Sequence, residues 1–285
     1  MSQPCKINQK LHVPVKKDKD TSVAESLETS VRLLPYLPYL LQDLWALGGS
    51  VEDIISLIGD LDLPAKTTRI LDLGCGKGAV SIRLAQKFGF NVVGIDAMQP
   101  FLKVASEKAR AFGVSQLCKF EMGDIHAYVS DRHDFDVVIL ASLGGLFGSL
   151  KKTVGVLRSQ IKTAGYIIID DGYLKNKLRL KRAGYFHYTN HETSIRALTS
   201  FGDQILREIN TTDLSKRINF DYLESMSRRS VQLAVHHPEL ANEIQSYMER
   251  QKEECEFIDE MIEGALWLLQ KKMEDKSCRS PSLAN

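Results

Sequence analysis

The chain lacks several features that would place it at once in a large class of proteins. No apolar run among its 285 residues approaches the roughly 18 residues that a transmembrane helix needs, so we expect no membrane partner. Basic and acidic residues nearly balance at a formal net charge of +1, which disfavours nucleic acid as a partner. The first residues also lack a hydrophobic signal core, which predicts a cytoplasmic protein.

Paired cysteines are missing as well. The five cysteines are scattered, and no two have the CxxC spacing of a metal or redox site. We therefore expect reduced thiols and no metal. What remains is an ordinary globular composition, 44% hydrophobic and 26% charged, and a length that suits one enlarged domain.

Polar segments at both ends enclose a more regular middle. Residues 1–22 and 273–285 are predicted to be a flexible arm and a flexible tail. Apolar residues at helical spacing predict an N-terminal helical cap over 23–62, which is broken at Gly48-Gly49-Ser50 with Ser50 as an N-cap. The main domain is expected to span 63–272.

From residue 69 onward, short apolar strands alternate with helices. The strands are expected at 70–73, 91–95, 118–122, 135–140 and 166–170. The helices between them are expected at 79–88, 99–112 and 150–161. Repeated βα units of this length predict a parallel sheet with right-handed crossovers.

After Asp170 the alternation becomes irregular. A long connection is expected over 171–189, and after it come a helix, a strand, a long helical insertion and a last strand, at 191–201, 204–211, 213–260 and 265–269. Pro238 is expected to divide the insertion into two helices. The apolar stripe of these helices fits either a lid or the surface of a homodimer.

The most informative motif is the glycine-rich loop after the first strand. It reads Leu71-Asp72-Leu73-Gly74-Cys75-Gly76-Lys77-Gly78 and joins a strand to a helix. Glycines there let the chain turn sharply and let a ligand approach the backbone. Taken alone, the loop also fits a dinucleotide, because Ala79 completes a Gly-x-Gly-x-x-Ala pattern.

Three acids at strand ends separate these two interpretations. Asp72 precedes the glycines, where a carboxylate suits an ammonium group and would repel a pyrophosphate. Asp96 ends the next strand and suits the hydroxyls of a ribose, which either kind of ligand carries. Asp124 follows the third strand, where a carboxylate or its neighbouring amide can bind the exocyclic amine of an adenine.

Together these residues resemble the class I methyltransferases that depend on S-adenosylmethionine (SAM), and the resemblance is close over about 65–170. It implies an α/β fold: a Rossmann-like, seven-stranded, mostly parallel sheet with helices on both faces, a final antiparallel strand, and N- and C-terminal helical segments as a lid. It also implies SAM as cofactor and S-adenosylhomocysteine (SAH) as product. The residues that it places at the cofactor are Asp72, Gly74, Cys75, Gly76, Gly78, Asp96, Ala97, Met98, Asp124, Ile125, Ala141 and Ser142. Tyr36 and Tyr39 are candidates to line or close the same pocket, or to pack the N-terminal helix.

Methyl transfer needs an aligned acceptor, and it needs a general base only where the acceptor holds a proton at neutral pH. His187 and His191 lie in an aromatic cluster after the fifth strand and are candidate bases. Asp171 and Tyr173 directly follow that strand and are candidates to face the acceptor. All four lie outside the part of the chain that resembles the SAM core.

The end of the fourth strand argues against several kinds of methyltransferase. Leu140-Ala141-Ser142-Leu143-Gly144 contains neither the Pro-Pro-aromatic motif that holds a flipped base nor a Pro-Cys nucleophile. Asp170-Asp171 resembles half of a metal-dependent pattern, but Ala141 stands where its first acid belongs, so we expect no magnesium.

Four functions stay open at this stage. The favoured one is methyl transfer to a small-molecule acceptor. The basic run over 175–182 fits instead an RNA or protein substrate, although a charged loop is more often a solvated face. An NAD-dependent dehydrogenase is disfavoured by Asp72, and a SAM-binding protein without turnover is the fourth.

Overall fold

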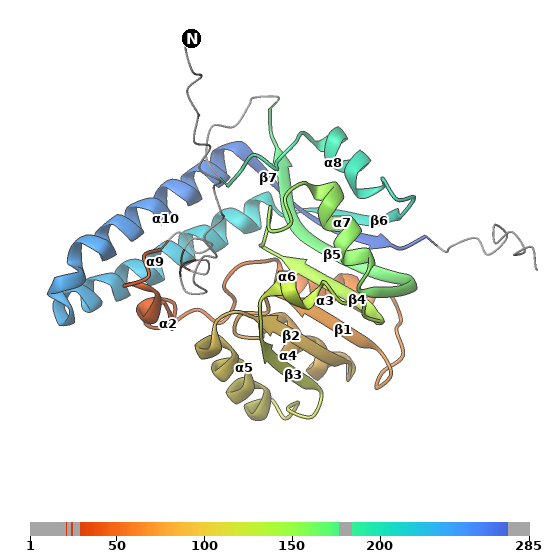
Figure 1. The fold of residues 1–285 in the computed structure, drawn as a ribbon, viewed down its shortest axis with the longest axis horizontal. Helices are drawn as coiled ribbons and strands as arrows, with labels where there is room; N and C mark the ends of the chain where they lie inside the picture. The colour runs from red at the N-terminus through yellow and green to blue at the C-terminus, as the bar shows by residue number, and fades with distance from the viewer. Residues whose placement is uncertain (1–20, 22–23, 25–28, 177–183, 273–285) are drawn as a thin grey trace, which may run out of the picture.

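The computed structural model describes residues 21, 24, 29–176 and 184–272, which form one mixed sheet with helices around it (Figure 1). Seven strands are present in this part of the chain, in the order β3-β2-β1-β4-β5-β7-β6. Their bounds are β1 Arg69–Leu73, β2 Asn91–Asp96, β3 Cys118–Met122, β4 Phe135–Ala141, β5 Ile161–Leu174, β6 Gln204–Asn210 and β7 Ile262–Gln270. Only β7 is antiparallel to its neighbours, which confirms the predicted fold class.

The helices cover both faces of the sheet. Within the first 200 residues they are η1 Leu34–Tyr36, α2 Leu37–Leu40, α3 Val51–Gly59, α4 Ala79–Phe88, α5 Gln99–Ala111, α6 Ile125–Tyr128, α7 Leu150–Arg158 and α8 His191–Leu198. Helices α3, α4 and α5 contribute to one apolar cluster against the sheet, and α7 and α8 contribute to a second cluster on the other face. The sheet is therefore the middle layer of three.

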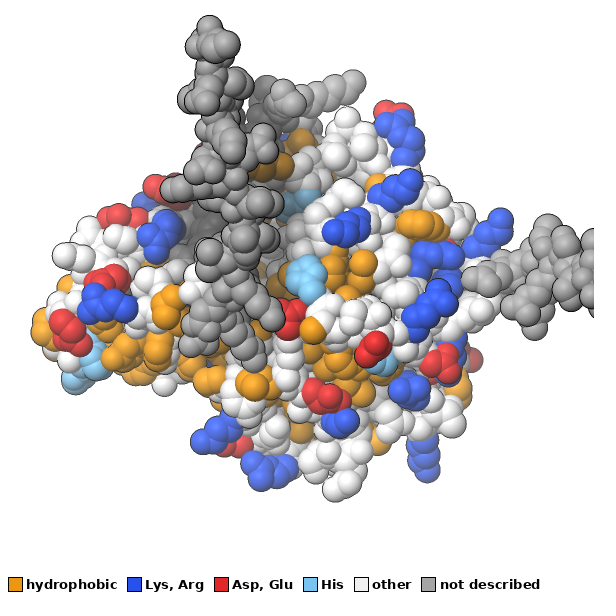
Figure 2. Space-filling view, viewed as in Figure 1, with side chains coloured by type: hydrophobic (Ala, Val, Ile, Leu, Met, Phe, Trp, Pro, Cys, Tyr) orange, Lys and Arg blue, Asp and Glu red, His pale blue; other side chains and the backbone are white. Residues whose placement is uncertain are grey.

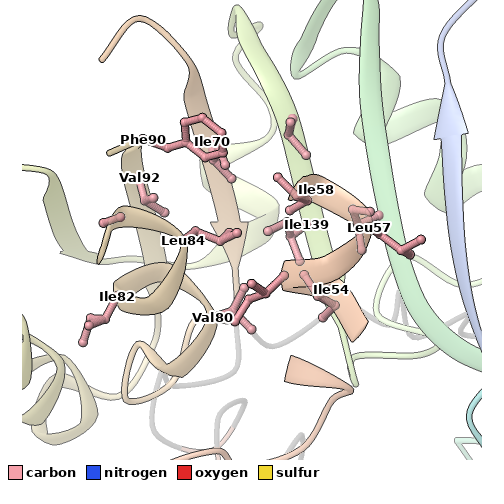
Figure 3. Close-up of a cluster of buried hydrophobic side chains, with 14 of the residues drawn as sticks. Ile54, Leu57, Ile58, Ile70, Val80, Ile82, Leu84, Phe90, Val92 and Ile139 are labelled. Carbon is pink, nitrogen blue, oxygen red and sulfur yellow. The ribbon is translucent and has the colours of Figure 1, made fainter. Parts of the chain in front are cut away.

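Helix α3 belongs to this core. Its side chains Ile54, Leu57 and Ile58 belong to the same buried cluster as Leu84 of α4 and Ile139 of β4 (Figure 3). The sequence shows the helical spacing of these apolar residues but not the surface on which they pack. Helix α3 therefore packs on the central sheet.

The long helical insertion forms a hairpin between β6 and β7. It consists of α9 Thr212–His236, a short turn η2 Pro238–Leu240 and α10 Ala241–Met261, so Pro238 divides it as predicted. The two helices lie side by side, with α2 against α9 (Figure 1). Apolar side chains also reach the surface of this hairpin (Figure 2), among them Phe220, Val231 and Val235 of α9.

Two sequence expectations are wrong in detail. Helix was expected through most of 23–61, but 41–50 is non-helical, and Gly48 and Gly49 there have φ values of +154° and +79°. The strand expected to stop at Asp170 continues to Leu174, because β7 supplies hydrogen-bonding partners along 171–174. Apart from residue 21, the predicted arm lies outside the described residues, as do the predicted tail and 177–182 of the basic run.

Candidate cofactor and acceptor site

The glycine loop turns at the carboxyl end of β1. Gly74, Gly76 and Gly78 have φ values of +73°, +52° and +73°, a left-handed conformation that favours glycine. The amides of Gly74 and Cys75 both donate to the Ile95 carbonyl, at 2.8 and 3.1 Å. The loop is therefore a fixed turn that is tied to the end of β2.

Asp96 connects this loop to the next helix. Its carboxylate accepts hydrogen bonds from the Gly76 amide at 2.9 Å and from the Met98 amide at 2.8 Å. Burial raises the pKa of Asp96, while the backbone amides that bind the charged form act in the opposite direction. Asp96 and Ala97 both keep part of their surface exposed, so a ligand can reach this strand end.

Asp72 and Cys75 lie deeper. Asp72 is 4% exposed and accepts a hydrogen bond from the Ser81 hydroxyl of α4 at 2.5 Å, and burial raises its pKa to about 6. The buried Cys75 thiol lies against Gly94 of β2, and burial raises its pKa well above the usual range. Cys75 therefore fills space in a tight loop. The ammonium partner of Asp72 stays a prediction.

Asp124 stands at the end of the neighbouring strand. It is the N-cap of α6, and its Oδ1 accepts a hydrogen bond from the Ala127 amide at 3.0 Å. Ile125 opens the helix and packs against the second core cluster. The Gly123 amide donates to the Asp96 carbonyl at 3.0 Å, so both predicted acids lie at one edge of the sheet.

The chain bends sharply after β4. Ser142 follows Ala141 with a φ of +55°, an uncommon conformation for a residue with a side chain. Its amide donates to the Asp170 carbonyl at 2.9 Å. The next residue, Leu143, packs so closely on Gly74 that a Cβ there would overlap its Cδ1. The loop after β4 therefore contacts the glycine loop directly.

A segment before α3, which we call the strap (residues 46–50), lies over the same edge. A Cβ at Gly76 would lie 3.2 Å from Cδ1 of Leu47, and a Cβ at Gly48 would lie 3.0 Å from Cβ of Ser142. The strap thus touches both the glycine loop and the loop after β4. Its two glycines allow this close approach.

Two buried groups anchor the strap and the turn before it. The Asp170 carboxylate accepts a hydrogen bond from the Ser50 amide at 2.5 Å. Lys77, which is 3% exposed, donates from Nζ to the carbonyls of Leu41 at 2.5 Å and Leu44 at 2.6 Å. Ser50 stands at the N-cap position as predicted, but its side chain makes no capping hydrogen bond.

Asp171 and Tyr188 lie together beside the loop that follows β4. The Asp171 carboxylate lies against Gly144, where a Cβ would be 2.5 Å from Oδ1. That oxygen accepts a hydrogen bond from the Tyr188 hydroxyl at 2.7 Å. Burial raises the pKa of Asp171 to about 7 and holds the pKa of Tyr188 well above its usual range.

His187 lies next to this pair. Its ring is 4.2 Å from that of Tyr188 and rests on Gly145. Its Nδ1 lies 3.0 Å from the Gly184 carbonyl oxygen, and burial lowers the pKa of the ring. The structure therefore brings together Asp171 and His187, two of the four predicted acceptor residues.

The other two predicted residues form a separate pair. The Tyr173 hydroxyl donates to Glu263 at 2.9 Å, and the ring of Tyr173 lies 4.6 Å from that of His191. His191 also contacts Glu208 of β6 at 2.7 Å. Tyr173 and His191 therefore lie toward the edge strand of the sheet, apart from Gly144 and Gly145.

Tyr36 and Tyr39 pack on the helical hairpin. The ring of Tyr36 lies 4.7 Å from that of His237, and the Tyr39 hydroxyl donates to Gln232 at 2.9 Å. These contacts correspond to packing of the N-terminal helix, which is one of the two alternatives for these tyrosines.

Two kinds of feature are absent from the described ranges 29–176 and 184–272. No helix in those ranges is both long and apolar enough to cross a membrane. No group of three or more His, Cys, Asp or Glu side chains in the same part of the chain has an arrangement that could hold a metal ion.

Sequence reasoning missed the strap, Lys77 and the Asp171–Tyr188 pair. Gly48 and Gly49 were visible in the sequence, but they indicated only a break between helices. The strap meets Ser142 and Asp170, which lie about 90 to 120 residues later, and such contacts leave no local signal. Its position over the sheet edge could therefore not be predicted.

Comparison with known proteins places these features in context. A family model described as a methyltransferase domain matches residues 64–272. A ubiquinone biosynthesis O-methyltransferase of Rickettsia felis is 33% identical over 119 residues, which are 42% of this chain and 46% of that protein. Phosphoethanolamine N-methyltransferase 1 of Zea mays is 37% identical over 70 residues, 25% of this chain and 14% of that protein.

The fold is also similar to solved structures. A SAM-dependent methyltransferase from Geobacter sulfurreducens, crystallised with SAH, superposes with a TM-score of 0.71 at 20% identity and covers 84% of this chain and 98% of its own. At this identity the similarity concerns the fold alone. The chain spans less than half the length of the curated relatives that it matches.

Proposed function

The chain belongs to the methyltransferase domain family, and we propose that it binds SAM and transfers the methyl group to a small-molecule acceptor, releasing SAH. The observation that supports this most is the placement of Asp96. It is a partly exposed carboxylate that is hydrogen-bonded to the amides of Gly76 and Met98, at the carboxyl end of β2. Ligands of open α/β sheets bind at this edge.

The residues at this edge fit SAM chemically. The left-handed glycines let a ligand approach the backbone closely, Asp96 is placed for ribose hydroxyls, and Asp124 begins a helix at the next strand, where an adenine would lie. When bound, SAM supplies an activated methyl group on a sulfonium. Positioning of the acceptor and exclusion of water are then the main tasks of the protein.

In our proposal, the strap excludes water from the site. It contacts Gly76 and Ser142 and is anchored by Asp170 and Lys77. A ligand that lies along the glycine loop must therefore displace Leu47 or lie beneath it. The strap would then cover the bound cofactor and keep water from the reacting atoms.

Asp171 and His187 are our candidates for handling the proton of the acceptor. Both lie against the loop after β4, at Gly144 and Gly145, and that loop touches the glycine loop through Leu143. A pKa of about 7 suits Asp171 to accept a proton near neutral pH. One relative is named for O-methylation and another for N-methylation, so the comparisons suit either acceptor atom.

Calorimetric titration with SAM, SAH and NAD tests the proposal. Wild-type protein should bind SAM or SAH with a dissociation constant on the order of micromolar. Asp96→Ala should lose that binding, whereas the matched control Asp131→Ala, an exposed turn residue, should keep it. Binding of NAD alone would refute the proposal. Light scattering on the same sample distinguishes the two alternatives for the helical hairpin, a lid or the surface of a homodimer.

A further inference from the structure

The acceptor side of the site is acidic and aromatic. Asp171 lies against Gly144, with its Oδ1 bound by the Tyr188 hydroxyl. The ring of Tyr185 stacks on that of Tyr188 at 5.8 Å and 19°, and the Tyr185 hydroxyl donates to the Glu254 carboxylate of α10. Rings and carboxylates thus alternate along one wall of the site.

In the described part of the chain, the charges that act on Asp171 and Tyr188 are those of neighbouring acids. Asp170 acts on the Asp171 carboxyl as a like charge, and Asp171 and Glu254 act the same way on Tyr188. The nearby Lys175 directs its Nζ to the Asp259 carbonyl at 2.6 Å. Among residues 29–176 and 184–272, no ion pair joins Asp171 to a lysine or arginine.

His187 supplies a second acceptor on this wall, and this one lacks a donor. The Gly184 carbonyl can only accept, so the 3.0 Å contact places the hydrogen on Nδ1 of His187. In a neutral imidazole this leaves Nε2 as an acceptor. Nε2 is buried and has no hydrogen-bond partner within the described structure. A buried acceptor without a donor is uncommon in proteins, so we take Nε2 as open to a donor from a ligand.

We propose that the acceptor of the methyl group is a protonated amine, held by the Asp171 carboxylate, by Nε2 of His187 and by the ring of Tyr188. This rests on the proposed function. An ammonium group supplies several N–H donors and a positive charge, which matches two acceptors and an aromatic face. A single ammonium group would supply the donor that Nε2 of His187 lacks and a positive charge beside Asp171.

A hydroxyl acceptor fits the same wall less well. Methylation of a phenol proceeds through a developing phenolate, and its negative charge would lie beside the Asp171 carboxylate and near Glu254. An amine acceptor instead gains positive charge as it reacts, which the Glu254 carboxylate stabilises while Asp171 holds the transferred proton. The wall therefore selects between acceptor atoms through the sign of the charge that develops.

The proton and electron balance is simple. The ammonium gives one proton to the Asp171 carboxylate, which frees the lone pair of nitrogen. A nitrogen–carbon bond then forms to the methyl group while the sulfur–carbon bond of SAM breaks and sulfur keeps the electron pair. The positive charge moves from sulfur to nitrogen, and Asp171 returns its proton to solvent after the product leaves.

A pair of probes of equal shape isolates the charge preference. The SAH-saturated protein is titrated with choline and with its neutral carbon analogue, 3,3-dimethylbutan-1-ol. Choline has no proton to lose, so it reports recognition of the cation without chemistry. We expect choline to bind at least about tenfold more tightly than the alcohol. Equal binding, or tighter binding of the alcohol, would overturn the proposal.

Variants assign the preference to this wall. Asp171→Asn should remove most of the preference for choline while SAH binding stays unchanged, which also shows that the variant is folded. The control Asp131→Asn should keep the preference, and so should Tyr188→Phe, which retains the carboxylate and the ring. If Asp171→Asn instead weakens SAM but neither SAH nor choline, Asp171 serves the sulfonium and the amine proposal is wrong.

The outcomes also separate this inference from the proposed function. Binding of SAH without any binding of choline would overturn the amine acceptor and leave the methyltransferase proposal standing. Failure to bind SAH or SAM at all would overturn both.

Discussion

Replacing Gly172 with alanine tests the unexpected extension of β5 beside the acceptor wall. Gly172 pairs with Gly264 of β7, and its φ is not in the left-handed region, so its backbone conformation is open to alanine. A Cβ at this position would lie 2.5 Å from Cγ2 of Ile262 and 2.6 Å from the Glu263 carbonyl oxygen. The carbonyl belongs to the paired strand and cannot rotate away, so the two strands would have to separate.

The size and the sign of the effect follow from this geometry. Overpacking of a buried site typically costs 1–3 kcal/mol, and we expect Gly172→Ala to lower the free energy of unfolding by about 2 kcal/mol. In an open loop the same substitution would raise it by roughly 0.4–1 kcal/mol, because alanine reduces the entropy of the unfolded chain. The strand and the loop therefore predict opposite signs.

The free energy of unfolding is measured by urea unfolding of the wild type and two variants. The control is Gly123→Ala, since a Cβ there meets only Cγ2 of Ile95 at 3.7 Å, an ordinary contact. Gly123→Ala should stay within about 0.5 kcal/mol of the wild type. A Gly172→Ala variant as stable as the wild type would refute the extended strand, and an equal loss in Gly123→Ala would show that the effect is not specific to β5.

Three further predictions concern the strap and the site. Lys77→Met should lower the free energy of unfolding by about 2 kcal/mol, because the carbonyls of Leu41 and Leu44 lose charged donors, and hydrogen exchange in the strap should accelerate. Burial raises the pKa of Asp170 from 3.8 to about 6, so its stabilising contribution is complete below pH 4 and is lost as the pH rises through 6. Asp170→Asn should therefore gain about 3 kcal/mol over the wild type between pH 4 and pH 8 in urea unfolding, and an unchanged difference would contradict the assigned burial. His191→Ala should leave choline binding to the SAH complex unchanged, because its imidazole is held by a glutamate of β6, and a loss of about tenfold would place it in the acceptor site instead.

Much of the fold is visible in the sequence because it is local. The run Leu71–Gly78 predicts a strand, a sharp turn and a helix, and the structure has all three. Val92 to Asp96 and Phe135 to Leu140 are strands where their apolar runs indicate them. Apolar periodicity and glycine positions are properties of neighbouring residues, so they survive without knowledge of distant contacts.

The end of β5 shows where that local information stops. Residues 171–174 contain an acid, a glycine and a tyrosine, which give no apolar pattern, and only pairing with β7 makes them a strand. The hydrogen bonds that hold them come from a segment about ninety residues later. The same separation explains why Asp171 and His187 meet at the loop after β4, whereas Tyr173 and His191 form a second pair that contacts Glu263 and Glu208.

By itself, the sequence determined the half of the site that we propose for the cofactor: a glycine turn, and acids at the ends of two adjacent strands, because each of these features is set within a few residues. Only the tertiary structure decided the half that we propose for the acceptor. It carried the strap over the glycine loop, and it placed a carboxylate, an unpaired imidazole nitrogen and a tyrosine ring on one wall. The physical reason is that those groups meet through strand pairing and side-chain packing between distant segments, which no local pattern records.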